Sequence, residues 1–291
     1  MHMLNLYVNR VFPGDDFRPL VYSGAMILHT KLRSTVEFCG YAQQCIRQVF
    51  GDRLDARVVH TELAVEQFVE KVSTLKGEFT NSTASKEHIR NFLEEINQDP
   101  EEYFFDVPRI RVVPDYDYLH AGVSYAYLPH RDTWYGAPQC QINTWMPVFP
   151  IDPDQTMMIN PTYFDRPVQN DSGDWDLQHW VTNERPAATQ NINNEDRRHP
   201  VPLEEVGTDT ELRLAGGTGD MIVFSGSHLH GTVPNRTGRV RYSIDFRVFH
   251  REDLNERAGA ANQDGAARNI EFGLRDLLRA SDFTPYLEAV Q

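Results

Sequence analysis

Cysteine is scarce in this sequence, and its scarcity argues against a fold held together by disulfides. Only three cysteines, Cys39, Cys45 and Cys140, occur among the 291 residues. Cys39 and Cys45 are six positions apart on an expected helix, so they point to different faces and are poor disulfide partners. Three thiols without a disulfide framework are typical of a reducing compartment, and we expect a cytoplasmic protein. Cys140 lies near the candidate site in the sequence, but we expect it to be a small buried residue.

Basic residues are also scarce, because 28 lysines and arginines stand against 42 aspartates and glutamates, giving a formal net charge of -14. A nucleic acid or an anionic membrane surface requires a basic face, so this balance argues against both partners. No apolar run approaches the roughly 18 residues that a membrane-spanning helix needs, and no signal peptide is visible. We expect a small-molecule partner, and the composition leaves the oligomeric state open.

Three common catalytic motifs are missing. The sequence contains no His-Glu-x-x-His motif and no Gly-x-Ser-x-Gly motif. The glycine-rich stretch 214–220 lacks the lysine and the following helix of a phosphate-binding loop, so we expect it to form a tight turn. These absences argue against zincin, α/β-hydrolase and phosphate-loop chemistry.

Residues 1–105 carry apolar side chains at helical spacing and are expected to be mainly helical. The expected helices cover about 34–50, 61–76 and 86–97. A capping box from Ser34 to Glu37 is expected to begin the first helix, and Gly77 is expected to end the second. The apolar faces of these helices are expected to pack on the outside of a sheet.

From about residue 106 the apolar periodicity changes from helical to extended. The expected strands cover about 109–113, 121–130, 140–149, 156–160, 211–214, 220–224, 228–233 and 239–249. Many short strands with turns between them indicate a sandwich or barrel core over 106–250. A C-terminal segment over 251–291, with a helix at about 265–280, is expected to complete a single domain of residues 1–291.

Residues 162–210 interrupt the strands with an irregular stretch rich in Asn, Asp, Pro, Thr and Arg. So long an irregular stretch within a compact domain is either a functional lid or a disordered segment. Its place between the two segments that carry the candidate ligands favours a lid. Within it, Arg197, Arg198 and His199 form a basic cluster that is either a contact for an anionic substrate or a solvated run of charges.

Residues 240–248 alternate between apolar and polar side chains, which predicts a strand with two different faces. Its polar side chains belong to Arg241, Ser243, Asp245 and Arg247. A polar strand face inside a mostly apolar protein indicates that this face lines a site. His228 and His230, two positions apart just upstream, are expected to share one face of the neighbouring extended segment.

A second segment, 123–150, supplies His130 and Asp132. These side chains are two positions apart on an extended segment, so both can reach one ion. Two histidines and one carboxylate, with coordination positions left open, form the facial triad of non-haem Fe(II) oxygenases. We therefore nominate His130, Asp132 and His230 as metal ligands, with His228 as the competing third ligand.

These motifs resemble those of the Fe(II)/2-oxoglutarate-dependent oxygenases, in particular the phytanoyl-CoA dioxygenase-like branch. The matching residues, all within about 120–250, are His130-Arg-Asp132, Trp145, Gly219-Asp220, and the stretch from His230-Gly231 through Asn235 to Arg241. In that family an arginine follows the distal histidine by eleven positions, as Arg241 follows His230 here. His228 and Arg241 do not have this spacing, which favours His230 as the third ligand.

The resemblance implies a mainly β fold with flanking helices: a double-stranded β-helix, the jelly-roll relative of cupins, with the N-terminal helices packed on one sheet. It implies Fe(II) as cofactor, 2-oxoglutarate and O2 as cosubstrates, hydroxylation or a related oxidation of a C–H bond in a small molecule, and release of succinate and CO2. Arg241 would bind the far carboxylate of 2-oxoglutarate, and Thr232 would donate a hydrogen bond to it. Trp145 would pack against the cosubstrate.

A second interpretation stands beside this one: a β-helix protein that binds a divalent metal such as zinc without oxidative chemistry, as a hydrolase or a binding module. Hydrolysis would need a general base beside the metal-bound water, and no motif supplies one. This interpretation also gives Arg241 no role. Two other His-x-carboxylate triplets, at His60 and His250, have no downstream His-Gly and Arg in register and are expected at the surface.

Overall fold

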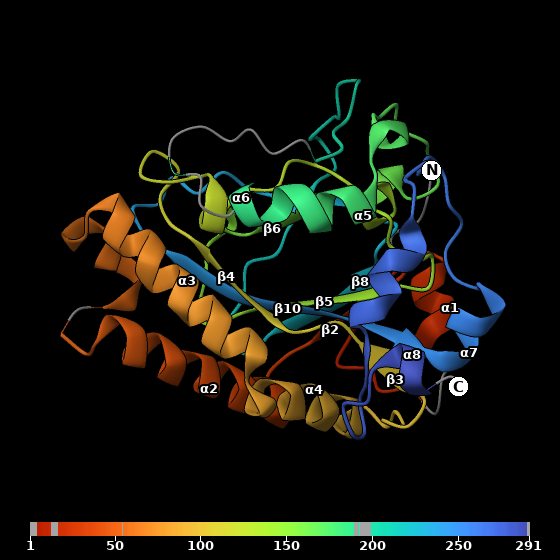
Figure 1. The fold of residues 1–291 in the computed structure, drawn as a ribbon, viewed down its shortest axis with the longest axis horizontal. Helices are drawn as coiled ribbons and strands as arrows, with labels where there is room; N and C mark the ends of the chain where they lie inside the picture. Colours follow the sequence, from red (N-terminus) through yellow and green to blue (C-terminus); the bar gives the residue numbers. More distant parts are fainter. Residues whose placement is uncertain (1–4, 13–16, 54, 189–191, 193–198, 290–291) are drawn as a thin grey trace.

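Two β-sheets and a layer of helices make up the fold in the computed structural model (Figure 1). The structure describes residues 5–12, 17–53, 55–188, 192 and 199–289. It confirms the predicted class at the level of β-sheets with flanking helices. In this described part of the chain, no helix combines the length and the apolar character needed to span a membrane.

The major sheet has eight strands in the order β1-β2-β8-β5-β10-β3-β11, and β4 also pairs with β10. Its strands are β1 Leu6–Val8, β2 Met26–His29, β3 Tyr103–Phe105, β4 Arg109–Val113, β5 Ile142–Pro147, β8 Met221–Ser225, β10 Arg241–His250 and β11 Leu278–Arg279. β5 pairs antiparallel with one edge of β10, while β4 and β3 pair antiparallel with the other. The first 105 residues therefore contribute three strands that the helical expectation for this part missed.

The minor sheet has three strands in the order β7-β6-β9. They are β6 Met157–Asn160, β7 Leu212–Arg213 and β9 Leu229–Thr232. A cavity lies between the two sheets, because Arg241 and Arg247 of β10 line it together with Met157 of β6 and Thr232 of β9. The predicted assignment of the two faces of β10 is confirmed, since its apolar side chains belong to the main hydrophobic core.

A helical layer covers the apolar face of the major sheet (Figure 1). The α-helices are α1 Phe17–Tyr22, α2 Arg33–Phe50, α3 Val65–Asn81, α4 Thr83–Glu95, α5 Leu177–His179, α6 Arg185–Ala188, α7 Arg251–Glu256 and α8 Tyr286–Ala289. The layer consists of α2, α3 and α4, and Phe38 of α2 and Phe92 of α4 both contact Phe246 of β10. The N-terminal helices thus pack on one sheet, as predicted.

A residue from another helix sets the start of α2, so the predicted capping box is wrong. The backbone N–H groups of Arg33 and Ser34 donate to the carboxylate of Glu95, the last residue of α4, at 3.0 and 2.7 Å. Glu37 pairs with Arg33 instead of capping the helix. A carboxylate at a helix N-terminus satisfies unpaired N–H groups and interacts favourably with the helix dipole.

α3 continues through Gly77, which was expected to end it, and stops at Asn81. An interior glycine costs a helix about 1 kcal/mol relative to alanine. Leu75 and Phe79, on either side of Gly77, are fully buried, and each gains about 1.5–3 kcal/mol from leaving water. Tertiary packing therefore outweighs the local preference for a break.

Two segments differ more strongly from expectation. Residues 121–130 form no strand; they contain a short 3-10 helix, Gly122–Ser124, and a loop that lines the cavity. Their tyrosines resemble a strand pattern, but these rings face the cavity. The closing helix expected at 265–280 is instead a 3-10 helix, Ile270–Asp276, followed by β11, which pairs with β3.

The 162–210 segment carries short helical turns, including α5 and α6, on the cavity side of the major sheet (Figure 1). The remaining 3-10 and π turns of the described chain are Ala56–Glu62, Asp132–Tyr135, Pro153–Gln155, Pro161–Tyr163, Ser172–Asp174 and Trp180–Glu184. Trp175, Trp180 and His199 line the cavity, so this segment forms one of its walls. Arg197 and Arg198 of the predicted basic cluster lie outside the described residues. The lid function and the single-domain organisation stay predictions.

Candidate functional site

The cavity between the two sheets has a volume of about 420 Å³. The residues predicted for the site all line it: His130, Asp132, Trp145, His230, Thr232 and Arg241. Small-molecule sites in proteins have volumes of about 300–1,000 Å³. The cavity therefore has the size of a small-molecule site.

His130, Asp132 and His230 form one cluster, in which a potential ligand atom from each lies within 4.8 Å of the other two. Asp132 Oδ1 is 3.7 Å from His130 Nε2 and 3.9 Å from His230 Nε2. The three side chains are only 6%, 8% and 11% exposed, respectively. The fold thus brings together the three nominated residues from distant segments, and their role as metal ligands stays a prediction.

The backbone pairs the two histidines of this cluster directly. His130 N donates to His230 O at 2.8 Å, and His230 N donates to His130 O at 2.9 Å, as an isolated antiparallel bridge. The segments approach so closely that a Cβ on Gly231 would lie 3.0 Å from the backbone nitrogen of Pro129. Glycine after the distal histidine therefore lets the two ligand-bearing segments meet.

Each of these imidazoles has one nitrogen held by the backbone and one facing the cluster. His130 Nδ1 is 2.7 Å from Leu128 O, and His230 Nδ1 is 2.9 Å from His228 O. A carbonyl oxygen only accepts hydrogen bonds, so each Nδ1 carries the proton and each Nε2 keeps its lone pair. Burial and the neighbouring His130 lower the pKa of His230 to about 4, so this ring is neutral at neutral pH. A neutral imidazole is the form that binds a metal ion.

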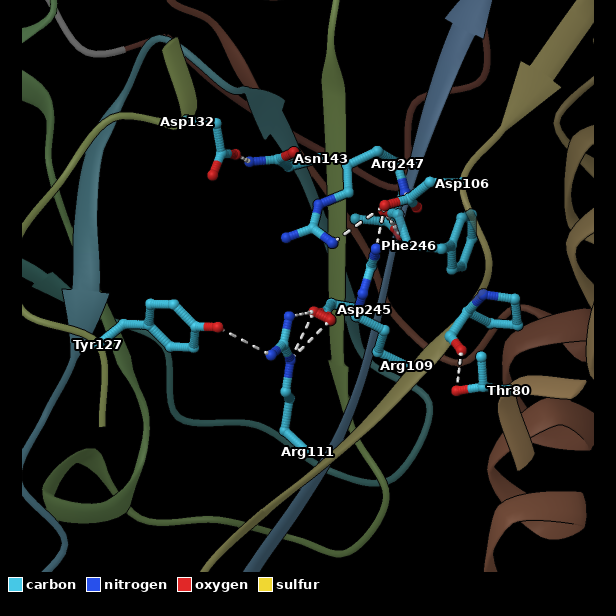
Figure 2. A network of polar contacts seen from close by, with 12 residues as sticks. Thr80, Asp106, Arg109, Arg111, Tyr127, Asp132, Asn143, Asp245, Phe246 and Arg247 are labelled. Carbon is cyan, nitrogen blue, oxygen red and sulfur yellow. Dashed lines mark hydrogen bonds and ion pairs between the residues drawn. The ribbon is translucent and has the colours of Figure 1, made fainter. Parts of the chain in front are cut away.

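Asp132 is held through one of its two oxygens. Gln141 Nε2 and Asn143 Nδ2 donate to Oδ2 at 2.8 and 2.5 Å, and Figure 2 shows Asn143 beside the carboxylate. Burial raises the pKa of Asp132, but the neighbouring imidazoles, His230 foremost, and Arg247 lower it to below its usual range. The carboxylate is therefore ionised and presents Oδ1 to the two histidines.

We expect Asn143→Ala to weaken divalent-metal affinity about 10- to 100-fold, the range usual for residues that orient metal ligands. The substitution removes one of the two donors that fix Oδ2 of Asp132, so the carboxylate gains rotational freedom. Asn160→Ala is the matched control, because Asn160 is also buried but donates to Gly207 O. Competition with a chelating dye measures the affinity, and thermal unfolding checks the fold. Undiminished affinity in Asn143→Ala would contradict this positioning role.

His228, the competing third ligand, lies outside the cluster. Its ring is fully buried, with Nδ1 3.2 Å from Ser225 O and Nε2 3.2 Å from Gly24 O. Burial lowers the pKa of His228 to about 3. Because β9 begins one residue later, His228 belongs to the preceding turn and shares no strand face with His230, and that expectation is wrong.

The other two His-x-carboxylate triplets were expected at the surface, but both of their histidines are buried. His60 contacts the ring of Tyr118 edge-on, with centroids 5.2 Å apart. His250 contacts Tyr103 in the same way at 5.1 Å. Neither histidine is among the residues that line the cavity, so both serve aromatic packing.

Arg241 lines the cavity, and its guanidinium has a hydrogen-bond donor without a partner among the described residues. Its guanidinium carbon is 5.9 Å from the ring centroid of Trp145, and Nη1 donates to Thr156 O at 2.9 Å. Its Nε is buried and has no partner among the described residues. Burial and the nearby Arg111 lower the pKa of Arg241 to about 10, so the group is still cationic at neutral pH. A buried cation with a free donor is suited to an anion.

Comparison with known proteins gives only remote structural similarities. No family model and no curated protein matches the sequence. Among solved structures, the chain is similar to EvdO2 from Micromonospora carbonacea var. aurantiaca complexed with 2-oxoglutarate, at 12% identity over 83% of this chain and 93% of that chain, with a TM-score of 0.46. It is similar to EctD from S. alaskensis in its apoform, at 14% identity over 84% of this chain and 77% of that chain, with a TM-score of 0.41.

A further similar structure is SnoN from nogalamycin biosynthesis, a non-heme alpha ketoglutarate dependent epimerase. The identity is 9% over 77% of this chain and 77% of that chain, with a TM-score of 0.38.

Sequence reasoning missed several polar residues of the cavity and its surroundings. Gln141 and Asn143, which contact Asp132, alternate with apolar neighbours at the start of β5. Arg109 and Arg111 alternate with apolar residues along β4 and line the cavity. The alternation rule that identified the polar face of β10 applies to both strands and would have identified these four residues.

Proposed function

We propose that this protein is a non-haem Fe(II)- and 2-oxoglutarate-dependent oxygenase that oxidises a C–H bond of a small molecule. The observation that carries the proposal is the meeting, in one cavity, of His130, Asp132, His230 and the buried guanidinium of Arg241. Two imidazoles and one carboxylate with open positions form the ligand set of non-haem Fe(II) oxygenases. A buried cation in the same cavity provides for a dicarboxylate cosubstrate.

His130 and His230 hold the metal through Nε2, and Asp132 holds it through Oδ1. Their other polar atoms are occupied by backbone carbonyls or by the amides of Gln141 and Asn143, which fixes the direction of each ligand. When bound, Fe(II) with 2-oxoglutarate and O2 supplies the C–H oxidation, and the cosubstrate is released as succinate and CO2.

Arg241 binds the far carboxylate of 2-oxoglutarate, because its planar guanidinium can donate two parallel hydrogen bonds to a carboxylate. Thr232 supplies a hydroxyl donor from β9. The ring of Trp145, which already lies beside the guanidinium, packs against the carbon chain of the cosubstrate.

The walls of the cavity keep water away from the reacting bond. Tyr135 stacks on His130, with ring centroids 4.6 Å apart, and Trp175 continues this aromatic surface at 5.8 Å. The 162–210 segment, which carries Trp175, acts as the lid over the cavity. The two sheets are the halves of a double-stranded β-helix, and the substrate is a small molecule.

We expect the protein to release succinate from 2-oxoglutarate when supplied with Fe(II), ascorbate and O2, with the rate rising in the presence of the right small molecule. Anaerobic addition of 2-oxoglutarate to the Fe(II)-loaded protein should also produce a visible charge-transfer band from the chelated keto acid. This second measurement does not require the substrate to be known. If the purified protein contained zinc instead of iron, and the Fe(II)-loaded protein gave no charge-transfer band with 2-oxoglutarate, the proposal would be overturned. The alternative, a metal-binding protein without oxidative activity, would then be favoured.

A further inference from the structure

The cavity region contains more positive charge than the proposed cosubstrate neutralises. Four arginines of β4 and β10 line the cavity: Arg109, Arg111, Arg241 and Arg247. Asp106 pairs with two of them and Asp245 with a third. Four guanidinium groups against two carboxylates leave two positive charges in excess. The far carboxylate of 2-oxoglutarate at Arg241 balances only one of these.

The metal centre does not balance the other charge. A divalent ion carries two positive charges, and Asp132 and the keto-acid carboxylate of 2-oxoglutarate together supply two negative charges. Arg185 adds a further cation to the cavity lining. Burial and, less strongly, the positive charges of Arg109 and Arg111 lower the pKa of Arg185. In a chain of net charge -14, such a local excess attracts an anionic ligand.

Arg247 is the guanidinium best placed to meet this ligand. Its Nη1 donates to Asp106 at 3.1 Å, and Figure 2 shows the group lying between Asp106 and the Asn143–Asp132 pair. Its side chain is 20% accessible, and it lines the cavity. Arg111, by contrast, is engaged side-on by Asp245, whose two oxygens lie 3.0 and 2.9 Å from its Nε. An anion at Arg247 therefore lies beside the metal ligands.

Aromatic rings form a continuous surface that begins at the metal cluster. Tyr135 stacks on His130, Trp175 follows at 5.8 Å from Tyr135, and Trp180 follows at 5.3 Å from Trp175, all measured between ring centroids. These rings are tilted by 42° and 37° to one another, and each offers a large apolar face on which an aromatic group can pack. The cavity thus offers a cation, Arg247, and an aromatic surface, and both lie close to the candidate metal ligands.

We propose that the prime substrate consists of an oxyanion attached to a flat, unsaturated or aromatic body. Arg247 and Arg109 bind the oxyanion, and the body packs on Tyr135 and Trp175. The inference rests on the proposed function and deepens it by naming the substrate class. A carboxylate and a phosphate accept the same hydrogen bonds from a guanidinium, so the shared chemistry is that of an oxyanion.

The test uses benzoate, phenyl phosphate and the uncharged benzamide as probes of protein loaded with Mn(II) and saturated with 2-oxoglutarate. Tryptophan fluorescence and the shift in Tm measure binding. We expect at least one oxyanion to bind about 10-fold or more tightly than benzamide, the contribution usual for a charged hydrogen bond. The tighter oxyanion distinguishes a carboxylate from a phosphate substrate. Equal binding of benzamide, or no saturable binding of either oxyanion, would overturn the inference.

Arg247→Gln should abolish the preference for the oxyanion while leaving the Kd for 2-oxoglutarate unchanged. Asp106 keeps Arg109 as a partner in this variant, so Arg109 stays neutralised and cannot replace the lost guanidinium. Arg239→Gln, at an exposed position before β10, should keep the preference. A preference that survives Arg247→Gln would overturn the inference.

Binding of Mn(II) and 2-oxoglutarate is measured first on the same samples. Its failure would overturn the proposed function itself. Normal metal and cosubstrate binding combined with indifference to the charge of the probe would overturn only the substrate class.

Discussion

His130→Ala and His230→Ala are expected to abolish Fe(II) binding and turnover, whereas His228→Ala is expected to keep most of the bound metal. Each of the first two substitutions removes one of three ligand atoms from a cluster that lies within 4.8 Å. His228 points elsewhere, with both ring nitrogens against backbone carbonyls. Metal analysis of the three purified variants measures the outcome.

His228 is fully buried, so its removal lowers stability as well. A large-to-small change in a core costs about 2–5 kcal/mol, and the metal content must therefore be expressed per folded protein, with circular dichroism and Tm measured on each sample. An iron-free His228→Ala together with an iron-loaded His230→Ala would reverse the ligand assignment. The conclusion does not depend on knowing the substrate.

Arg241→Ala is expected to raise the 2-oxoglutarate concentration needed for half-saturation about 10- to 150-fold, since a hydrogen bond to a charged group contributes about 1.5–3 kcal/mol. The unpaired Nε shows that the guanidinium has capacity beyond its bond to Thr156 O. Arg241→Lys should recover only part of the affinity, because an ammonium group cannot form the two-pronged contact. Titration of the charge-transfer band under anaerobic conditions measures the affinity directly.

The matched control for this series is Arg239→Ala, which removes an exposed arginine two positions earlier and should leave 2-oxoglutarate affinity unchanged. Thermal unfolding separates lost affinity from lost folding. If Arg247→Ala weakened 2-oxoglutarate binding and Arg241→Ala did not, the cosubstrate would lie against the other arginine of β10, and the anchor would be misassigned.

The two faces of β10 were predictable because they follow from a local rule. Alternation fixes which side chains of an extended strand share a face, so the polar row containing Arg241 followed directly from the sequence. His130 and Asp132 are close in sequence. The remaining connection came from the resemblance to a known family, in which an arginine follows the distal histidine by eleven positions, as Arg241 follows His230. The structure brings these residues into one cavity, and their chemical roles stay predictions.

The features that the sequence did not predict depend on partners that are distant in the chain. The N-terminus of α2 is capped by Glu95, which no rule confined to neighbouring residues can identify. β1 and β2 are short and gain stability from pairing, β1 with β2 and β2 with β8, not from their own pattern. The hydrogen bond from Asn143 to Asp132, which identifies Asn143 as a positioning residue, could be recognised only from the folded structure. The burial of His60 has the same cause, since Tyr118 comes from another segment.

One strand, β10, carries both arginines proposed to bind anions, so the strand geometry fixes the distance between them. Arg241 and Arg247 are six positions apart on the same face, and a strand rises about 3.3 Å per residue, so their Cα atoms are about 20 Å apart. In the proposed function, the cosubstrate and the substrate must therefore bind together within the fixed separation of these two arginines. The separation of Arg241 and Arg247 cannot be changed by one residue, because inserting one residue between them would turn one of the two guanidinium groups into the hydrophobic core.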